Sequence, residues 1–207
     1  MQLQNYYYWF KDAIPHHVCD DIVRYAKSIQ DEMAVTGGLG NRKLNKKEVQ
    51  DLKKKRDSDI VWLNERWIYN AIHPYIHQAN KDANWNFQWD FSESCQFTKY
   101  KKGQYYDWHC DSWDKPYDSP NTPSHGKTRK LSVTLSLSDD KDYSGGELEF
   151  DMRNQDPDKK TNTHVLKEIR SKGSLVVFPS DVWHRVKPVK RGIRHSLVIW
   201  NLGWPFK

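Results

Sequence analysis

Hydrophobic spacing divides the chain into a helical first part and a strand-rich second part. From 15 to 35, apolar residues recur at intervals of three and four, and the same spacing returns from 59 to 80. This periodicity predicts two amphipathic helices, the first starting at Pro15 and the second bent or capped at Pro74. The stretch 36–58 between them is polar and basic without apolar periodicity, which predicts a long flexible loop.

Beyond residue 84 the period changes to two, as expected for strands. Trp85, Phe87, Trp89 and Phe91 lie on one face, and short apolar runs separated by turn sequences follow. The later predicted strands are 95–100, 130–137, 147–150, 164–168, 174–178 and 194–201. Helices followed by about eight short strands favour a mainly β fold with flanking α-helices, a jelly roll buttressed by its N-terminal helices.

A length of 207 residues suits one domain. We expect a single domain over 1–207, with a helical part at 1–83 that includes the basic loop 36–58, and a β core at 84–207. The chain has no apolar run of about 18 residues and no signal-peptide pattern, so we expect a soluble cytoplasmic protein without a membrane partner. Three cysteines without a CxxC pair argue against a disulfide framework or a zinc ribbon.

The net charge of +6 and the pI of about 9.0 draw attention to nucleic acid as a partner. Much of the excess positive charge lies between Arg42 and Arg56, however, so the basicity is local. One interpretation is a solvated mobile loop, and the other is an electrostatic guide for an acidic or polyanionic partner.

Candidate metal ligands come from two places in the second part of the chain. His109 and Asp111 are two residues apart, which places their side chains on the same side of an extended segment. Such a pair is common in a chain with nine histidines, and it gains weight from His184, which follows the turn after the strand 174–178. Two imidazoles and one carboxylate can cover one face of an octahedral iron(II), leaving positions for a co-substrate and dioxygen.

A cation for such a co-substrate is available ten residues beyond His184. Arg194 can bind a carboxylate with two parallel hydrogen bonds and keeps its charge at any physiological pH. Ser196 and Trp200 share its face of the predicted strand, so they can add a hydroxyl donor and a wall to the same pocket.

Four ordered segments resemble the iron(II)/2-oxoglutarate dioxygenases of the prolyl 4-hydroxylase and PKHD-type group. They are YKKGQYYDWHCD (100–111), LSVTLSLS (131–138), YSGGELEF (143–150) and HRVKPVKRGIR (184–194). The resemblance extends from about residue 56 to residue 200. It implies a double-stranded β-helix core, Fe(II), 2-oxoglutarate and O2 as cofactors, ascorbate as reductant, and His109, Asp111, His184 and Arg194 as the catalytic set.

The resemblance also assigns roles residue by residue. It implies that Arg194, Tyr100 and Trp200 contact 2-oxoglutarate, with Ser196 beside them. At the position of Ser136, some peptidyl hydroxylases have a tyrosine that also contacts the carboxylate of 2-oxoglutarate. The shorter serine hydroxyl would leave a gap there, for which Thr134 can compensate. Collagen-type members have a lysine at the position of Arg194, so a collagen-like substrate is not assumed. The residues that match the peptide channel of similar prolyl hydroxylases are Arg56, Ser58, Tyr106 and Arg129.

The sequence therefore favours a dioxygenase that hydroxylates a peptidyl residue, with proline as the preferred target and the loop 36–58 as a lid over the peptide or protein substrate. Three alternatives stay open. The same chemistry could act on a nucleic-acid base, which the basic loop favours, or on a small amino-acid-like molecule. A binding module that has lost turnover is the third, and the intact set of ligands argues against it.

Overall fold

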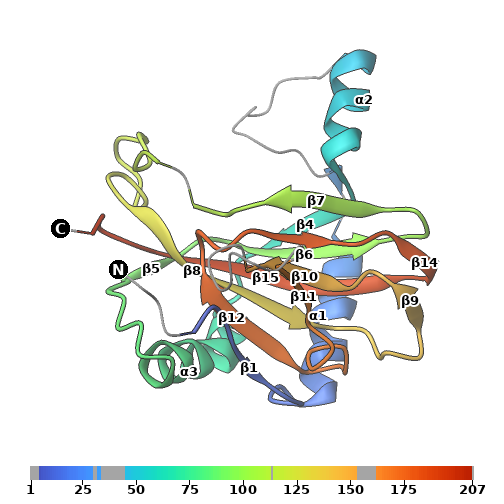
Figure 1. The fold of residues 1–207 in the computed structure, drawn as a ribbon, viewed down its shortest axis with the longest axis horizontal. Coiled ribbons are helices and arrows are strands. Elements are labelled where there is room, and N and C mark those ends of the chain that lie inside the picture. Colours follow the sequence, from blue (N-terminus) through green and yellow to red (C-terminus); the bar gives the residue numbers. More distant parts are fainter. Residues whose placement is uncertain (1–4, 30–31, 34–44, 113, 153–161, 207) are drawn as a thin grey trace.

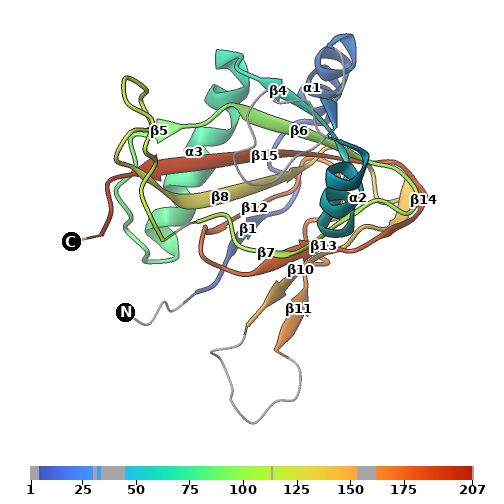
Figure 2. The same ribbon diagram turned by 90° about the horizontal axis from the view of Figure 1, so that it is seen from above.

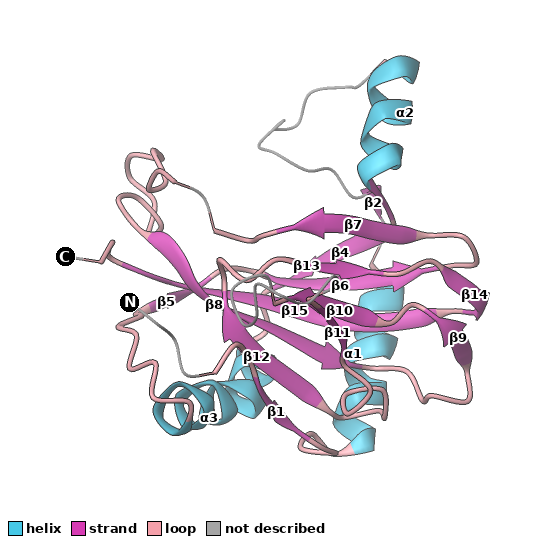
Figure 3. Cartoon of the chain, viewed as in Figure 1, coloured by secondary structure: helices cyan, strands magenta, loops and turns pink. Residues whose placement is uncertain are grey.

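A computed structural model describes residues 5–29, 32–33, 45–112, 114–152 and 162–206. Two β-sheets face each other, and two helices cover the outer side of the larger sheet (Figure 1, Figure 2). A further helix stands apart from these two, beside the smaller sheet (Figure 3). The helices are α1 (His16–Ser28), α2 (Lys46–Lys55) and α3 (Arg66–Asp82).

The larger sheet has eight strands within the described residues, and its pairings are antiparallel. In spatial order these strands are β1 (Tyr8–Phe10), β12 (Leu175–Pro179), β8 (Thr128–Ser136), β15 (Arg194–Gly203), β6 (Cys95–Tyr100), β4 (Asp59–Leu63) and β2 (Glu32–Met33), with β5 (Phe91–Ser92) paired to β15.

The smaller sheet runs in the order β11 (Thr163–Val165), β10 (Leu148–Asp151), β13 (His184–Val186), β7 (Tyr105–His109) and β3 (Arg56–Asp57). A two-stranded ribbon joins β14 (Val189–Gly192) to β9 (Tyr143–Gly145). Facing antiparallel sheets with helices on one side confirm the predicted mainly β jelly roll with flanking helices.

Apolar side chains on alternate faces of the larger sheet form two hydrophobic cores. On β12, Leu175 and Val177 pack with the helices, whereas Val176 and Phe178 pack between the two sheets. The first core also receives the buried isoleucines of α1 and α3, which are Ile22, Ile68, Ile72 and Ile76. Burial of apolar residues on both faces therefore fixes which way each strand side chain points, including the polar ones.

The first part of the chain contains strands that the sequence did not predict. The first helix ends at Ser28 rather than 35, and β2 follows it. The stretch 59–63 is the strand β4, although the spacing of Ile60 and Leu63 fits a helix equally well. Its pairing with β6 decides between the two, and α3 begins only at Arg66. Pro74 lies inside α3, so a cap at this residue is wrong, whereas the alternative of a bend stays a prediction.

The prediction of a basic loop over 36–58 is wrong for most of the residues that the structure describes in this range. Residues 46–55 form α2, which begins with a capping box between Asn45 and Glu48 that satisfies two backbone N–H groups. The strand β3 follows directly. Residues 36–44 lie outside the described part of the chain, and with them part of the proposed lid.

The alternating aromatic run from Trp85 is a strand only from Phe91 onward. Asn84 and Asn86 adopt left-handed backbone conformations, with φ of 57° and 53°, which cannot continue an extended strand. Trp85 and Phe87 are nevertheless buried in the first core. None of the helices in the described part of the chain is long and apolar enough to cross a lipid bilayer.

The arrangement of β15 generates a prediction about His195, whose ring stacks on Phe97 on the helix side of the sheet. Burial, together with the charges of Lys27 and Lys99, lowers the pKa of His195 to about 4. Below pH ~6.5 the unfolded chain therefore binds a proton that the folded chain does not bind, so this group costs stability as the pH falls from ~6.5 toward ~4.

We expect the free energy of unfolding in urea to be lower at pH 5 than at pH 7, and His195→Leu to remove about 1–2 kcal/mol of that difference. The matched control is His125→Leu, because His125 is exposed. Equal pH dependence in the wild type and in His195→Leu would contradict the burial argument.

Candidate metal centre and adjoining cavity

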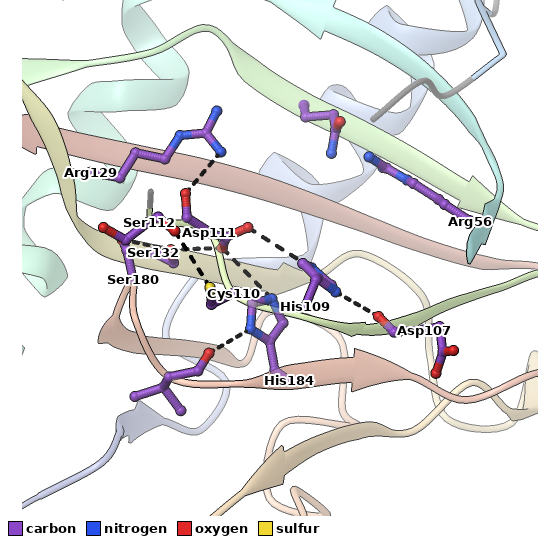
Figure 4. A network of polar contacts seen from close by, with 12 residues as sticks. Arg56, Asp107, His109, Cys110, Asp111, Ser112, Arg129, Ser132, Ser180 and His184 are labelled. Atoms are coloured by element: carbon purple, nitrogen blue, oxygen red, sulfur yellow. Dashed lines mark hydrogen bonds and ion pairs between the residues drawn. The ribbon is translucent and has the colours of Figure 1, made fainter. Parts of the chain in front are cut away.

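Backbone pairing between β7 and β13 brings the predicted metal ligands together (Figure 4). His184 lies directly opposite His109 in this ladder, although 74 residues separate them in the chain. Asp111 follows β7 by two residues, and its backbone N–H donates to the Ser180 carbonyl at 2.8 Å. The three side chains form a cluster in which one potential ligand atom of each lies within 4.8 Å of the others.

The cluster is compact and shielded from water. The Asp111 carboxylate oxygens lie 3.9 Å from Nε2 of His109 and 3.6 Å from Nε2 of His184. The imidazole ring centroids are 4.1 Å apart. Each of the three residues is no more than 7% exposed. Burying ionisable groups this closely is unfavourable unless they are paired or hold a metal ion.

Backbone carbonyls orient both imidazoles. Nδ1 of His109 is 2.7 Å from the carbonyl oxygen of Asp107, and Nδ1 of His184 is 2.9 Å from that of Val182. Because a carbonyl oxygen only accepts, each Nδ1 carries the hydrogen and donates it. In a neutral ring with this Nδ1 hydrogen, Nε2 carries the lone pair on the side of Asp111, which is the tautomer that a metal ligand needs.

Electrostatics keep His109 neutral and Asp111 ionised. Burial and the nearby His184 lower the pKa of His109 to about 3, so at neutral pH its contact with Asp111 is not an ion pair. Burial alone would raise the pKa of the Asp111 carboxyl, but His184, His109, Arg129 and a hydrogen bond from Ser132 hold it below its ordinary value. A neutral imidazole and a carboxylate anion are the metal-binding forms of both groups.

Two serines hold the Asp111 carboxylate in place. Ser132 on β8 donates to Oδ2 at 2.8 Å, and the hydroxyls of Ser132 and Ser180 are 2.9 Å apart. The sequence reasoning missed both residues. Ser132 could have been found, since it alternates with the predicted Thr134 and Ser136 on one face of the strand. Ser180 lies in the turn after the strand 174–178, to which the sequence reasoning assigned no role.

The predicted co-substrate residues line a cavity that reaches the three ligands. Arg194, Tyr100, Thr134, Ser196 and Trp200 all face it. Arg194 is 4% exposed, donates to the Ser196 hydroxyl at 3.1 Å, and has no carboxylate partner among the described residues. The Trp200 indole N–H, also buried, has no hydrogen-bond partner there either. Ser136 is not in the lining, and its hydroxyl donates to the Ser138 carbonyl at 3.4 Å.

The predicted substrate residues divide between two places. Arg56 and Tyr106 line the same cavity, and the Tyr106 ring stacks on His109 with centroids 3.5 Å apart. Ser58 is behind them and accepts from Nε of Arg56 at 3.1 Å. Arg129 is not part of this lining but lies next to it: it donates to the Asp111 carbonyl at 3.5 Å, is paired with Glu93 through two hydrogen bonds, and lies 3.9 Å from the Trp200 ring centroid.

Glycine makes room for the Arg194 side chain. Gly146 has a φ of +64°, and a Cβ there would lie 3.0 Å from Cδ of Arg194. A side chain at this position would be strained by its backbone and would press on the arginine. The backbone at the end of β9 therefore also shapes the cavity.

The donor set suits a metal ion, and the charge and hydrogen-bonding groups of the cavity lining suit a dicarboxylic co-substrate. Two imidazoles and one carboxylate leave one side of an octahedral ion open, which suits iron(II) better than the closed tetrahedral sites of zinc. Arg194 supplies a buried cation without an internal anion, as the distal carboxylate of 2-oxoglutarate requires. The unpartnered indole N–H of Trp200 can donate to an oxygen atom of a molecule bound there.

Comparisons with known proteins identify this arrangement. The family model described as 2OG-Fe(II) oxygenase superfamily matches residues 95–201, a stretch that includes all three ligands and Arg194. A PKHD-type hydroxylase of Synechococcus sp. (strain CC9902) is 37% identical over 99 residues, covering 47% of this chain and 36% of its own length. A PKHD-type hydroxylase of Pseudoalteromonas atlantica is 34% identical over 107 residues, covering 51% and 41% respectively. The chain thus spans well under half the length of these relatives.

Solved structures share the fold over nearly the whole chain. A prolyl 4-hydroxylase of Pseudomonas putida superposes with a TM-score of 0.64 at 19% identity, covering 96% of this chain and 92% of its own. A viral collagen prolyl hydroxylase from Paramecium bursaria Chlorella virus-1, solved with 2-oxoglutarate, has a TM-score of 0.63 at 18% identity and covers 97% of both chains. These neighbours support the jelly-roll fold.

Ser132→Ala should weaken metal binding. Removing the hydrogen bond to Oδ2 of Asp111 leaves that carboxylate less well oriented, so we expect the affinity for Mn(II) or anaerobic Fe(II) to fall by about 10- to 100-fold. The measurement is a calorimetric titration. Ser196→Ala is the control, because its hydroxyl serves Arg194 in the same cavity, and unchanged affinity is expected there. Equal affinities for both variants would exclude the proposed support of Asp111.

Proposed function

Because the chain belongs to the 2OG-Fe(II) oxygenase superfamily, we propose that it is an Fe(II)/2-oxoglutarate-dependent dioxygenase that hydroxylates a peptidyl residue, with proline as the preferred target. The observation that carries the proposal is one cavity lined both by the three ligands and by a buried arginine without an internal anion. Superfamily membership makes Fe(II), 2-oxoglutarate and O2 the expected cofactors, with ascorbate as a typical reductant.

Separate residues of this chain would bind the metal ion and the co-substrate. His109, Asp111 and His184 would hold iron, which supplies the activation of dioxygen that converts 2-oxoglutarate to succinate and carbon dioxide and oxidises the substrate. Arg194 and Ser196 would hold the distal carboxylate of 2-oxoglutarate. Tyr100 would stand beside it, since it lies opposite Arg194 in the β6–β15 ladder. The buried cavity would keep water from the reacting atoms.

A peptide is favoured as substrate by the side of the cavity formed by Arg56 and Tyr106. Arg56 is 6% exposed without a carboxylate partner among the described residues, so its remaining N–H groups are available to backbone carbonyls. Burial raises the pKa of Tyr106 to about 12, which keeps its hydroxyl protonated as a donor. A prolyl hydroxylase of Trichoplax adhaerens with the same fold was solved with a peptide of hypoxia-inducible factor, at a TM-score of 0.59 and 15% identity.

The two alternative substrates, a nucleic-acid base and a small amino-acid-like molecule, remain predictions. Lysines on α2 retain the basic character that favours a nucleic-acid base, and a small amino-acid-like substrate would fit the same chemistry. The cytoplasmic location and the single-domain organisation also stay predictions from the sequence.

Loss of a metal ligand should abolish turnover while the fold persists. For Asp111→Ala we expect succinate formation from 2-oxoglutarate to fall by more than about 100-fold. Asp107→Ala is the matched control, since its side chain is exposed and only its backbone carbonyl serves His109. Circular dichroism checks the fold. Succinate formation by Asp111→Ala at the wild-type rate would refute the assignment of the ligands.

Arg194→Ala should act on the co-substrate rather than on the metal. Losing a buried charge-assisted hydrogen-bonding partner is expected to raise the 2-oxoglutarate concentration for half-maximal turnover by about 10- to 100-fold, with little change in Mn(II) affinity. Arg191→Ala, an exposed arginine on β14, should leave both quantities unchanged. An unaltered 2-oxoglutarate requirement in Arg194→Ala would place the co-substrate elsewhere.

A further inference from the structure

A second cavity lies against the loop that holds Asp111. Its volume is about 330 Å³, and it is lined by Phe87, Ser112, Arg129, Lys130, Ser180, Asp181 and Phe206. A neighbouring cavity shares Phe87, Lys130 and Phe206 with it. Lys130 and the ring of Phe206 therefore stand where the two spaces meet.

Lys130 has an unusual environment for a lysine. The residue is 3% exposed, and its Nζ is buried without a hydrogen-bond partner among the described residues. The contact that the structure provides is the Phe206 ring, whose centroid is 3.3 Å from Nζ. Phe206 itself is 65% exposed, so the ring is a removable cover rather than part of the core. A buried ammonium without an anion is unfavourable, and burial lowers the pKa of Lys130 accordingly.

A bulge in the sheet places this lysine at the cavity. In the β8–β15 ladder, Leu131 is opposite Asn201 and Arg129 is opposite Leu202, so Lys130 has no partner and the register shifts there. Such an irregularity turns the extra residue away from the ordinary alternation, and bulges of this kind occur often beside active sites. Arg129 and Lys130, although adjacent in sequence, consequently line the same cavity.

Backbone hydrogen bonds link the strand that carries Lys130 to the loop that carries Asp111. The Ser180 N–H donates to the Lys130 carbonyl at 3.0 Å, and the Ser180 carbonyl accepts from the N–H of Asp111 at 2.8 Å. Ser136, which pairs with Ser196 beside Arg194, lies six residues along β8 from Lys130, a span of about 20 Å in a strand. Along β8, Ser132, which binds Asp111, therefore lies between Lys130 and Ser136, so 2-oxoglutarate held at Arg194 would not reach Lys130.

Charges around the cavity indicate what Lys130 can accept. Arg129 is already neutralised by its two hydrogen bonds to Glu93, and Asp181 adds a negative charge to the lining. A single ammonium beside a carboxylate suits a monoanion better than a doubly charged phosphate. Phe87 and Phe206 add an apolar surface on which the carbon skeleton of the bound molecule can pack.

We propose that Lys130 anchors a carboxylate of the substrate, which displaces or slides beneath the Phe206 ring while the carbon to be oxidised lies at the metal ligands. The proposal rests on the proposed function and narrows the substrate class to acidic molecules. The carboxylate can belong to an acidic side chain near the target residue of a peptide, or to a small free amino acid.

The test uses pairs of probes that differ only in one negative charge. The first set comprises blocked peptides with a central proline and either Glu or Gln at each position within three residues of it. The second set comprises L-proline against L-prolinamide. Binding to the purified full chain is measured by calorimetry, both without metal and with Mn(II) and 2-oxoglutarate present. Turnover with iron is then followed as kcat/KM for the same pairs.

In the wild type, at least one carboxylate probe should bind about tenfold or more tightly than its amide partner. Lys130→Met should lose that preference, and Lys130→Arg should retain part of it. Lys102→Met, which changes an exposed lysine in a turn, should keep the preference in full. A preference confined to the peptides identifies an acidic side chain, and one confined to L-proline identifies a free acid.

Two results would overturn the proposal. One is an equal carboxylate preference in the wild type and Lys130→Met, and the other is no preference in the wild type for any pair. These results are distinguishable from a failure of the proposed function, because binding is measured without turnover. Charge-dependent binding that needs Lys130, without succinate formation from any probe, would retain the carboxylate site and refute the hydroxylase.

Discussion

Antiparallel pairing of β7 with β13 is the constraint on which the site depends. It sets His184 opposite His109 and leaves Asp111 at the end of β7, where the turn after β12 supplies the carbonyl of Ser180. A shift of the β7–β13 register by one residue would turn one imidazole to the other face of the sheet and separate the three side chains. The pairing is short, so its register is fixed from outside, by β10 and β3 on either side and by the burial of Val186 between the sheets.

Side chains of the larger sheet alternate between its two faces, so one face packs with the helices and the other faces the smaller sheet and the cavity. On β8, Leu131, Val133 and Leu135 pack with the helices, and the residues between them are hydroxyl-bearing and face the opposite sheet. On β15, Leu197 and Ile199 belong to the helix side, while Arg194, Ser196 and Trp200 line the cavity. The apolar core thus holds the polar face in place. Residues on one side of these strands stabilise the fold, and residues on the other side line the cavity.

The sequence carried enough information to predict the jelly roll, the convergence of His109, Asp111 and His184, and the place of Arg194 in the same cavity, because the alternation of side chains along each strand can be read from the sequence. It could not separate a strand from a helix at 59–63, where the spacing of Ile60 and Leu63 suits both and pairing with β6 decides. It missed α2 because that helix has a polar surface and is recognisable mainly by the Asn45 cap. Lys130 also escaped prediction, since its placement results from a bulge that exists only once β8 and β15 are paired.

Both imidazoles are anchored by the carbonyl group two residues earlier in the chain. Every amino acid offers that oxygen, so the identities at 107 and 182 are not what aims the rings. Over evolutionary time these two positions can exchange side chains without disturbing the geometry of the ligands, as long as the chain follows the same path. Selection for metal binding would then appear as a preserved backbone shape, and a search for invariant acidic partners of the histidines would overlook it.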